Sequence, residues 1–256
     1  MPVGSAPWSG LAAGRSRRSN VGSALPLVIA HRGASGYRPE NTLSAYELAV
    51  ELRADLIEID LHRTRDGAIV VTHDEDLSGL GGRGEIADAS LAEIRALDAG
   101  LGERVPTLDE VLGRFGSRIP FNLELKQSTR GPYRDLERET LERVEHLGLL
   151  EATLFSSFYD PVLRALRAHS PRARIGVLVS PESPERWRER ARSVRAEALN
   201  LWKGLATTET VRAAHEEGLR VLVYTVDEPD AMGRLLERGV DGIFTNFPDR
   251  LRALLG

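Results

Sequence analysis

Residues 28–77 read VIAHRGASGYRPENTLSAYELAVELRADLIEIDLHRTRDGAIVVTHDEDL, and they contain one complete unit of the fold that the sequence predicts. The apolar run Leu27–Ala30 predicts a first strand, and the period of apolar residues over Leu43–Arg53 predicts a helix. A second apolar run, Leu56–Leu61, predicts the next strand. This order of strand, helix and strand is typical of parallel α/β architecture.

The second strand continues into a predicted β-hairpin. The turn Arg65-Asp66-Gly67 carries residues that favour a tight reversal, and it separates Leu56–Arg63 from the short run Ala68–Thr72. We therefore expect one extra strand beside the parallel sheet.

The same alternation continues to the end of the chain. Further strands are predicted at Pro120–Leu125, Thr153–Ser156, Arg174–Val179, Ala198–Leu201, Arg220–Tyr224 and Gly242–Thr245. Further helices are predicted at Leu91–Leu97, Leu108–Phe115, Asp135–Leu147, Pro161–His169, Pro184–Arg192, Thr208–Glu217, Pro229–Glu237 and Pro248–Leu254. In a chain of 256 residues, this pattern predicts a single TIM-type (β/α)8 barrel with an extra hairpin strand. No glycine-rich nucleotide fingerprint favours the alternative, an open doubly wound sheet.

The domain organisation follows from composition. Residues 26–256 form the predicted barrel domain, whereas residues 1–25 are rich in Gly, Ser, Pro and Arg and lack the apolar core of a secretory signal. We interpret residues 1–25 as a flexible tail. The alternative is that Arg15, Arg17 and Arg18 contact anionic lipid or RNA.

Charge and cysteine content exclude several classes of function. The net charge of -4 gives no basic surface for a nucleic-acid partner. The chain has no Cys, which excludes disulfides, zinc-thiolate sites and a cysteine nucleophile. No stretch is long and apolar enough for stable membrane insertion, and the cytoplasm is the default location.

Three carboxylates fall at the predicted strand ends, where a barrel keeps its active site. Glu58 and Asp60 lie two residues apart and face the same side of one strand, and Glu124 and Lys126 repeat the spacing on the next barrel strand. Three carboxylates in one barrel mouth repel one another unless a cation neutralises them. Their oxygen ligands suit one divalent cation, Mg²⁺ or Ca²⁺. The alternative is that Glu58 or Glu124 pairs with Lys126 or with an arginine inside the barrel.

Two histidines also follow strand runs. Because an imidazole ordinarily exchanges its proton near neutral pH, we expect the pair His31 and His73 to donate and accept protons in one reaction, although either alone could be structural. Arg32 follows His31, and a guanidinium there can bind a phosphate in bidentate fashion or form a salt bridge at the barrel rim.

Other polar side chains occupy strand positions that face or end at the same mouth. They are Asn122, Ser156, Ser157, Asn200, Tyr224, Thr225, Thr245 and Asn246. His62 either faces the site or turns outward. The remaining histidines fall in predicted helices, where we expect surface positions: His146, His169 and His215.

Residues 28–77 closely resemble the amino-terminal signature of glycerophosphodiester phosphodiesterases. The resemblance rests on His-Arg-Gly, Pro-Glu-Asn-Thr, Glu-x-Asp, Thr-x-Asp-Gly and His-Asp in the family's order. Downstream, VPTLDEVL, NLELK, FSSF and VYTVDEPDAMGRLLERGVDGIFTNFP are similar to the family's other blocks, so the resemblance covers about residues 26–250.

The resemblance implies metal-dependent hydrolysis of glycerophosphodiesters to sn-glycerol 3-phosphate and an alcohol. The residues that it implies are Glu58, Asp60 and Glu124 for the metal, His31 and His73 for acid–base catalysis, Arg32, Lys126 and Tyr224 for the substrate, and Glu40 and Asn41 for the first loop. One histidine would deprotonate a glycerol hydroxyl that attacks phosphorus, the other would protonate the departing alcohol, and water would open the cyclic phosphate. The alternatives are a lysophospholipase D-type activity and a barrel that binds phosphate esters without turnover.

Three departures from the family pattern bear on the site. Asn246 stands where the family commonly has Asp, which implies a missing charge in the mouth. Tyr224 stands where many members have Trp and keeps an aromatic wall. The glycine-rich segment 75–84 differs from the usual block, and we interpret it as an element of substrate specificity.

Overall fold

Eight parallel strands close into a barrel in the computed structural model, which describes residues 25–256. The strands are β1 (Leu27–His31), β2 (Leu56–Arg63), β4 (Phe121–Leu125), β5 (Thr153–Ser157), β6 (Arg174–Val179), β7 (Ala198–Trp202), β8 (Arg220–Tyr224) and β9 (Gly242–Thr245). The barrel closes because β1 pairs with both β2 and β9. The predicted barrel is confirmed, and the predicted tail lies outside the described residues except for Leu25.

The predicted hairpin is also confirmed. Strand β3 (Ile69–Val71) runs antiparallel to β2, with Leu61 opposite Val71 and Arg63 opposite Ile69. Gly67 has φ 90° in the turn, a conformation that favours glycine. Because β3 lies outside the closed ring, it carries the following residues to the barrel mouth from one side.

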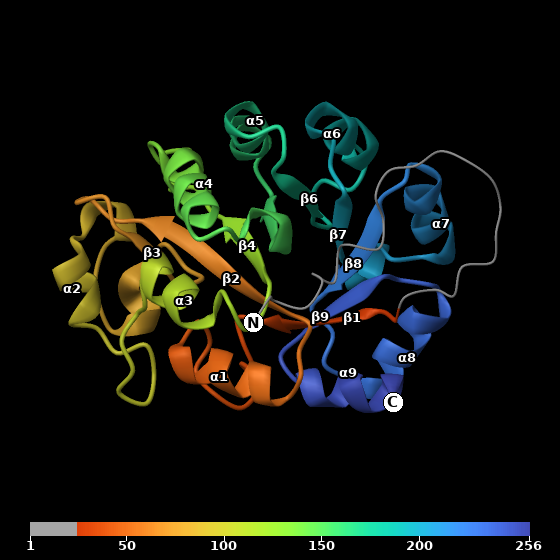
Figure 1. Cartoon of the computed structure of the whole chain (residues 1–256), viewed down its shortest axis with the longest axis horizontal. Helices are drawn as coiled ribbons and strands as arrows, with labels where there is room; N and C mark the ends of the chain where they lie inside the picture. The colour runs from red at the N-terminus through yellow and green to blue at the C-terminus, as the bar shows by residue number, and fades with distance from the viewer. Residues whose placement is uncertain (1–24) are drawn as a thin grey trace.

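Most helices form a ring around the strands (Figure 1). They are α1 (Leu43–Glu51), α2 (Leu91–Arg95), α3 (Leu108–Phe115), α4 (Leu136–His146), α5 (Asp160–His169), α6 (Trp187–Val194), α7 (Thr208–Glu216), α8 (Pro229–Glu237) and α9 (Pro248–Leu255). Thr107 forms a capping box with Glu110 at the start of α3, and Pro occupies the first turn of α5, α8 and α9. None of the helices in residues 25–256 combines the length and apolarity that crossing a bilayer requires.

The glycine-rich segment contains a short 3₁₀ turn, η1 (Leu77–Leu80), and a second such turn, η2 (Ile86–Asp88), follows it. Leu77 and Ile86 pack with Val70 of β3 in a small apolar cluster of their own. This cluster anchors the hairpin from which His73 reaches the mouth.

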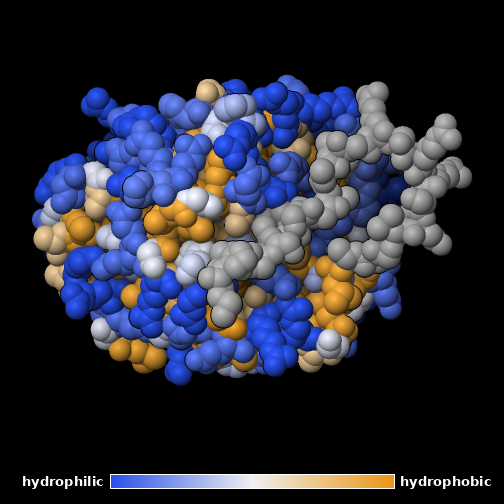
Figure 2. All heavy atoms as spheres, in the orientation of Figure 1, coloured by the Kyte–Doolittle hydropathy of each residue, from blue (hydrophilic) through white to orange (hydrophobic). Residues whose placement is uncertain are grey.

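The inner face of the barrel changes from apolar to polar along the strands. Its lower layer is an apolar cluster formed by Leu27, Ile29, Leu56, Leu154, Ala198, Leu222 and Phe244. Two residues further along each strand, Leu56 gives way to Glu58, Leu154 to Ser156 and Ala198 to Asn200. The larger apolar cluster lies between strands and helices, and hydrophilic side chains cover most of the face drawn in Figure 2. Apolar side chains therefore fill the barrel interior at one end of the strands, and polar side chains line its mouth at the other end.

Gly33, in the turn after β1, has no room for a side chain. Its φ is +84°, and a Cβ there would lie 2.7 Å from the Ala45 Cβ and 2.8 Å from the Ala45 backbone carbon. We expect Gly33→Ala to lower the free energy of unfolding by about 3 kcal/mol, through backbone strain and overpacking together. Urea denaturation measures the loss.

Gly84 is the matched control, since it also has φ +84° but has no atom within 4 Å of an added Cβ. Gly84→Ala should therefore show only the conformational cost, about 1 kcal/mol. Equal losses at the two positions would contradict the close contact with Ala45.

Candidate active site

Three buried carboxylates meet at the carboxyl ends of β2 and β4. Asp60 lies opposite Glu124 in the strand register, and Glu58 lies one inward-facing position before Asp60. Glu58, Asp60 and Glu124 each offer a carboxylate oxygen, and the three atoms lie within 4.8 Å of one another. We call these three residues the acidic triad. The predicted spacing of two along β2 does bring both carboxylates to one face.

Two cationic side chains contact the acidic triad. The Lys126 Nζ lies 2.8 Å from Asp60 Oδ1 and also pairs with Glu124, while the Arg32 Nε lies 3.2 Å from Asp60 Oδ2. Burial alone would raise the pKa of Asp60, but Lys126 and Arg32 lower it well below its usual range. Burial raises the pKa of Glu58 well above its usual range, with the charges of Asp60 and Glu124 adding to the effect. The positive charges of Lys126 and Arg32 therefore do not fully neutralise the three carboxylates of the triad.

The donor set fits a hard divalent cation. All three candidate ligands are carboxylates. Glu58 is the only one of the three that does not contact Lys126, and its burial strongly disfavours its ionised form. A cation beside Glu58 would supply the missing positive charge and oppose protonation. The triad can therefore hold a divalent metal ion. The pairing of Glu124 with Lys126, which the sequence offered as the alternative to a metal site, is present in the structure beside the three carboxylate oxygens.

The backbone after β1 is shaped around this cluster. Arg32 and Asn41 are non-glycine residues with positive φ, 55° and 57°. These conformations let the Arg32 backbone N–H donate to Glu58 Oε2 at 3.0 Å and the Asn41 Nδ2 donate to Asp60 Oδ2 at 2.9 Å. The Arg32 guanidinium also pairs with Glu40. Strained backbone at such a loop is a common feature of functional sites.

His31 is oriented by the last strand. Its Nδ1 lies 2.8 Å from Asn246 Oδ1, and the Asn246 Nδ2 donates to Asp227 Oδ2 at 2.8 Å. Because the Asn246 amide is fixed in this way, its oxygen faces His31, so the Nδ1 of His31 carries the proton and its Nε2 is free to accept one. Burial, followed by the charge of Arg32, lowers the pKa of His31 to about 4.

Asp227 explains the departure at position 246. Its carboxylate accepts hydrogen bonds from the Asn246 backbone N–H, from Asn246 Nδ2 and from Thr245 Oγ1. The carboxylate therefore contacts Asn246, which lies between it and His31. The charge that the sequence suggested was missing is thus supplied at Asp227. Asp227 lies in the block VYTVDEPDAMGRLLERGVDGIFTNFP, but the sequence assigned it no role because its contact with Asn246 depends on the folded barrel.

We expect Asp227→Asn to lower kcat about tenfold with little change in KM, because asparagine has one acceptor oxygen for the contacts that now use both carboxylate oxygens of Asp227, and the amide of Asn246 is then less firmly fixed. The paired change Asp227→Asn with Asn246→Asp should recover most of the loss, since a carboxylate and an amide are again adjacent. Steady-state kinetics of the two variants measure the effect. A paired variant no better than the single one would show that the orientation of Asn246 is unimportant.

His73 follows β3 and lines the same cavity as His31. Its Nδ1 lies 2.7 Å from Asp74 Oδ1, so the carboxylate favours a proton on this nitrogen. The His73 backbone carbonyl accepts from His62 Nε2 at 3.0 Å, and the Tyr133 hydroxyl donates to His62 Nδ1 at 2.8 Å. Burial lowers the pKa of His62 to about 4, which keeps it neutral. His62 therefore lies beside the site and supports His73.

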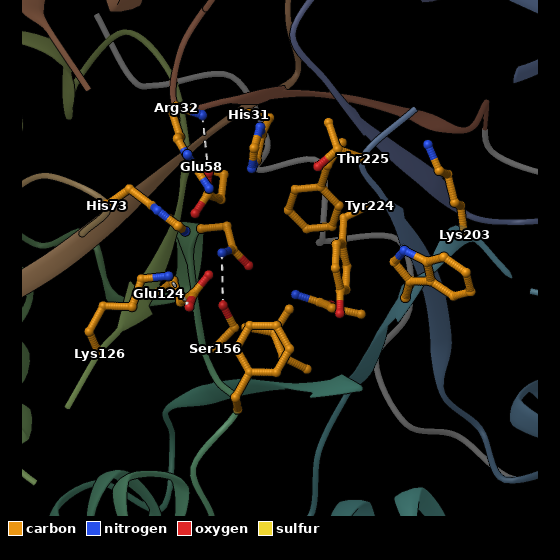
Figure 3. Close-up of a pocket in the computed structure, with 16 residues that line it drawn as sticks. His31, Arg32, Glu58, His73, Glu124, Lys126, Ser156, Lys203, Tyr224 and Thr225 are labelled. Atoms are coloured by element: carbon orange, nitrogen blue, oxygen red, sulfur yellow. Dashed lines mark hydrogen bonds and ion pairs between the residues drawn. The ribbon is translucent and has the colours of Figure 1, made fainter. Parts of the chain in front are cut away.

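The site opens into a cavity of about 370 Å³. His31, Arg32, Glu58, His73, Glu124 and Lys126 line one side, and Lys203, Tyr224 and Thr225 line the other (Figure 3). Asn200, Trp202 and Phe244 also line the cavity. The Tyr224 hydroxyl donates to the Val179 carbonyl at 2.9 Å, and its ring makes edge contacts with Phe158 and Phe244. These contacts hold the Tyr224 ring in place, so it gives the cavity a fixed aromatic surface.

The structure brings together the residues that the sequence predicted for the metal, the catalysis and the substrate, but three of the other strand-end residues, Ser157, Thr245 and Asn246, do not line the cavity. His31, Arg32, Glu58, His73, Glu124, Lys126 and Tyr224 line the cavity, and Asp60 lies beneath it in contact with Arg32 and Lys126. Of the other strand-end residues, Asn122, Ser156, Asn200 and Thr225 line it too. The predictions missed Trp202 and Lys203, because both stand at the end of β7 without a recognisable motif.

The mouth of this closed barrel holds three carboxylates, two histidines and two cationic side chains. These are the groups that metal-dependent phosphodiester hydrolysis requires. The profile of the Glycerophosphoryl diester phosphodiesterase family matches residues 31–250. The chain belongs to this family and hydrolyses glycerophosphodiesters, as the sequence predicted.

Individual relatives agree with this assignment. The glycerophosphodiester phosphodiesterase of Caldanaerobacter subterraneus subsp. tengcongensis is 36% identical over 234 residues, which cover 88% of this chain and 96% of the relative. An Oleispira antarctica phosphodiesterase, solved with the product sn-glycerol-3-phosphate, has a TM-score of 0.77 and 33% identity and covers 90% of this chain and 96% of that chain. A glycerophosphodiester phosphodiesterase from Agrobacterium tumefaciens has a TM-score of 0.75 and 28% identity over 88% and 98%.

Proposed function

We propose that the acidic triad binds one Mg²⁺ or Ca²⁺ ion and that His31 and His73 are the base and the acid of a two-step hydrolysis giving sn-glycerol 3-phosphate. The observation that carries the proposal is the contact pattern of the two histidines. His31 presents a free Nε2 because its Nδ1 is committed to Asn246, whereas the Nδ1 of His73 is paired with the Asp74 carboxylate. One histidine that accepts a proton and a second that donates one, both lining the same cavity, are what the reaction needs.

In the first step, the glycerol hydroxyl next to the ester gives its proton to His31 Nε2 while its oxygen attacks phosphorus. The bond from phosphorus to the alcohol breaks, and His73 gives the departing oxygen a proton. In the second step, water opens the cyclic phosphate with the proton transfers reversed. The product is glycerol 3-phosphate.

Arg32 and Lys126 hold the phosphate in this proposal. Arg32 is fixed by Glu40 and Asp60, and Lys126 by Asp60 and Glu124, so both cations are positioned before the substrate arrives. A divalent ion held by the triad supplies further positive charge against the charge that builds on the phosphate oxygens. Tyr224 forms the wall that keeps the substrate against these groups.

The test is hydrolysis of glycerophosphocholine followed by ³¹P NMR, using EDTA-treated protein to which Mg²⁺, Ca²⁺ or Mn²⁺ is restored separately. We expect glycerol 3-phosphate to appear only with a metal restored. A series of lysophospholipids of increasing acyl length separates the alternative activity, since a preference that rises with chain length would replace glycerophosphodiesters as substrates. Release of free phosphate or of glycerol would refute the proposed chemistry.

A further inference from the structure

A second hollow, of about 430 Å³, adjoins the active-site cavity at His73. His73, Glu124 and Lys126 line both spaces, whereas His31 lines the cavity of about 370 Å³ and not the second hollow. Figure 3 shows His73, Glu124 and Lys126 together on one side of the active-site cavity. The second hollow therefore begins at the histidine that we propose as the acid.

The reaction assigns the two halves of the substrate to these two spaces. The glycerol hydroxyl that attacks phosphorus must lie beside His31, and the departing oxygen must lie beside His73, which protonates it. The attacking and departing oxygens lie roughly in line on opposite sides of phosphorus. The glycerol half therefore occupies the active-site cavity, and the departing alcohol extends past His73 into the second hollow.

The second hollow adds two carboxylates to the wall that the two spaces share. Asp74 Oδ1 lies 2.7 Å from His73 Nδ1, and Glu75 Oε2 accepts a hydrogen bond from the Thr129 backbone N–H at 2.6 Å. In the described part of the chain, no arginine or lysine lies within ion-pair distance of either carboxylate. Lys126 lines the hollow, but its ammonium already pairs with two carboxylates of the acidic triad. A positively charged group is therefore favoured there over a negatively charged one.

Aromatic rings form another part of the same hollow. Phe158 lines both spaces, and its ring makes an edge contact with Tyr224. Tyr159 lines the second hollow and is 36% exposed, so its ring is available to a ligand. Ammonium and trimethylammonium groups bind aromatic rings through cation–π interactions, and nearby carboxylates add to the attraction.

We propose that the second hollow binds the departing alcohol and selects one that carries a cationic nitrogen, an ammonium or a trimethylammonium group. Glu75 supplies the unpaired negative charge, and Phe158 and Tyr159 supply the aromatic surface. Glu75 is also the first residue of the segment 75–84, which differs from the family's usual block. This inference rests on the proposed function and names the class of alcohol that the reaction releases.

Glycerophosphocholine and its uncharged isostere test the inference. In the isostere, the neohexyl ester of glycerol 3-phosphate, a carbon atom replaces the choline nitrogen, so the two substrates share a shape and differ by one positive charge. Wild-type protein should have a kcat/KM about tenfold higher for glycerophosphocholine, Glu75→Gln should lower this ratio about fivefold, and Tyr159→Leu should lower it about threefold. Glu145→Gln is the control, because it removes an exposed negative charge on α4 that lines neither space, and it should keep the wild-type ratio.

A wild-type ratio near one, or a ratio that Glu75→Gln leaves unchanged, would overturn the inference. Turnover of neither ester would instead count against the proposed function, and a measurement without turnover then decides about the hollow. In saturation-transfer difference NMR, free choline should give a stronger signal with wild-type protein than with Glu75→Gln, whereas neohexanol should give equal signals with both. Equal choline signals with the two proteins would refute the subsite.

Discussion

His31→Asn is expected to lower kcat about a thousandfold while KM changes by less than about threefold. Asparagine keeps a polar side chain of similar reach but has no group that accepts a proton at neutral pH. The residues that we propose to hold the phosphate, Arg32 and Lys126, make their contacts with Asp60 and Glu124 and do not contact His31. Binding should therefore survive the loss of the base. Initial rates over a range of substrate concentration separate the two parameters.

His169→Asn is the control, because His169 ends α5 on an exposed surface. It should have wild-type kinetics. A His31→Asn variant that keeps more than about a tenth of wild-type kcat would show that another group removes the proton. Addition of excess metal should not restore His31→Asn, which distinguishes it from a change in the acidic triad.

Glu124→Gln is expected to lower kcat/KM at least about a thousandfold at micromolar metal, and to weaken metal binding at least about a hundredfold. The amide keeps the shape of the side chain but removes one of three charges and the ion pair with Lys126. Isothermal titration with Mg²⁺ and with Ca²⁺ measures the affinity directly. High metal concentration should recover part of the activity, because Glu58 and Asp60 remain.

The same measurement has a predicted dependence on pH. Burial raises the pKa of Glu58 and of Glu124, and the metal must displace the protons that these groups bind. Affinity should therefore strengthen as pH rises and weaken as it falls, with protons released on binding. Glu137→Gln is the control for Glu124→Gln, since Glu137 is a buried glutamate of α4 outside the cavity. Equal metal affinity in Glu124→Gln and wild type would remove Glu124 from the metal site.

Much of the fold could be predicted because the local signals agree with the tertiary structure. The helix over Leu108–Phe115 was predicted to the residue, and its apolar period coincides with a capping box. Glu58 and Asp60 could be assigned to one face because the strand period leaves no choice. The helix predicted at Pro184–Arg192 was displaced: α6 spans Trp187–Val194, starting at the buried Trp187, and Pro184 lies before its first turn.

The supporting groups of the site could not be predicted, because they depend on contacts across the barrel. Asp227 lies 19 residues before Asn246 and 196 residues after His31, so only the closed sheet brings the three together. His62 shows the same limit: the strand period suggested either direction, and its contacts with Tyr133 and the His73 carbonyl settle its position beside the mouth. Local patterns place a residue on a strand, but only strand pairing decides what it meets.

The contact between His31 and Asn246 joins the first strand of the barrel to its last. Residues 215 positions apart must meet before His31 acquires a defined tautomer, and β9 must pair with β1 for that to happen. A chain that has formed only the amino-terminal half of the sheet would hold the whole acidic triad and yet lack an oriented base. During refolding from denaturant, the return of turnover should therefore lag behind the return of helical circular dichroism and would time the final closure of the ring.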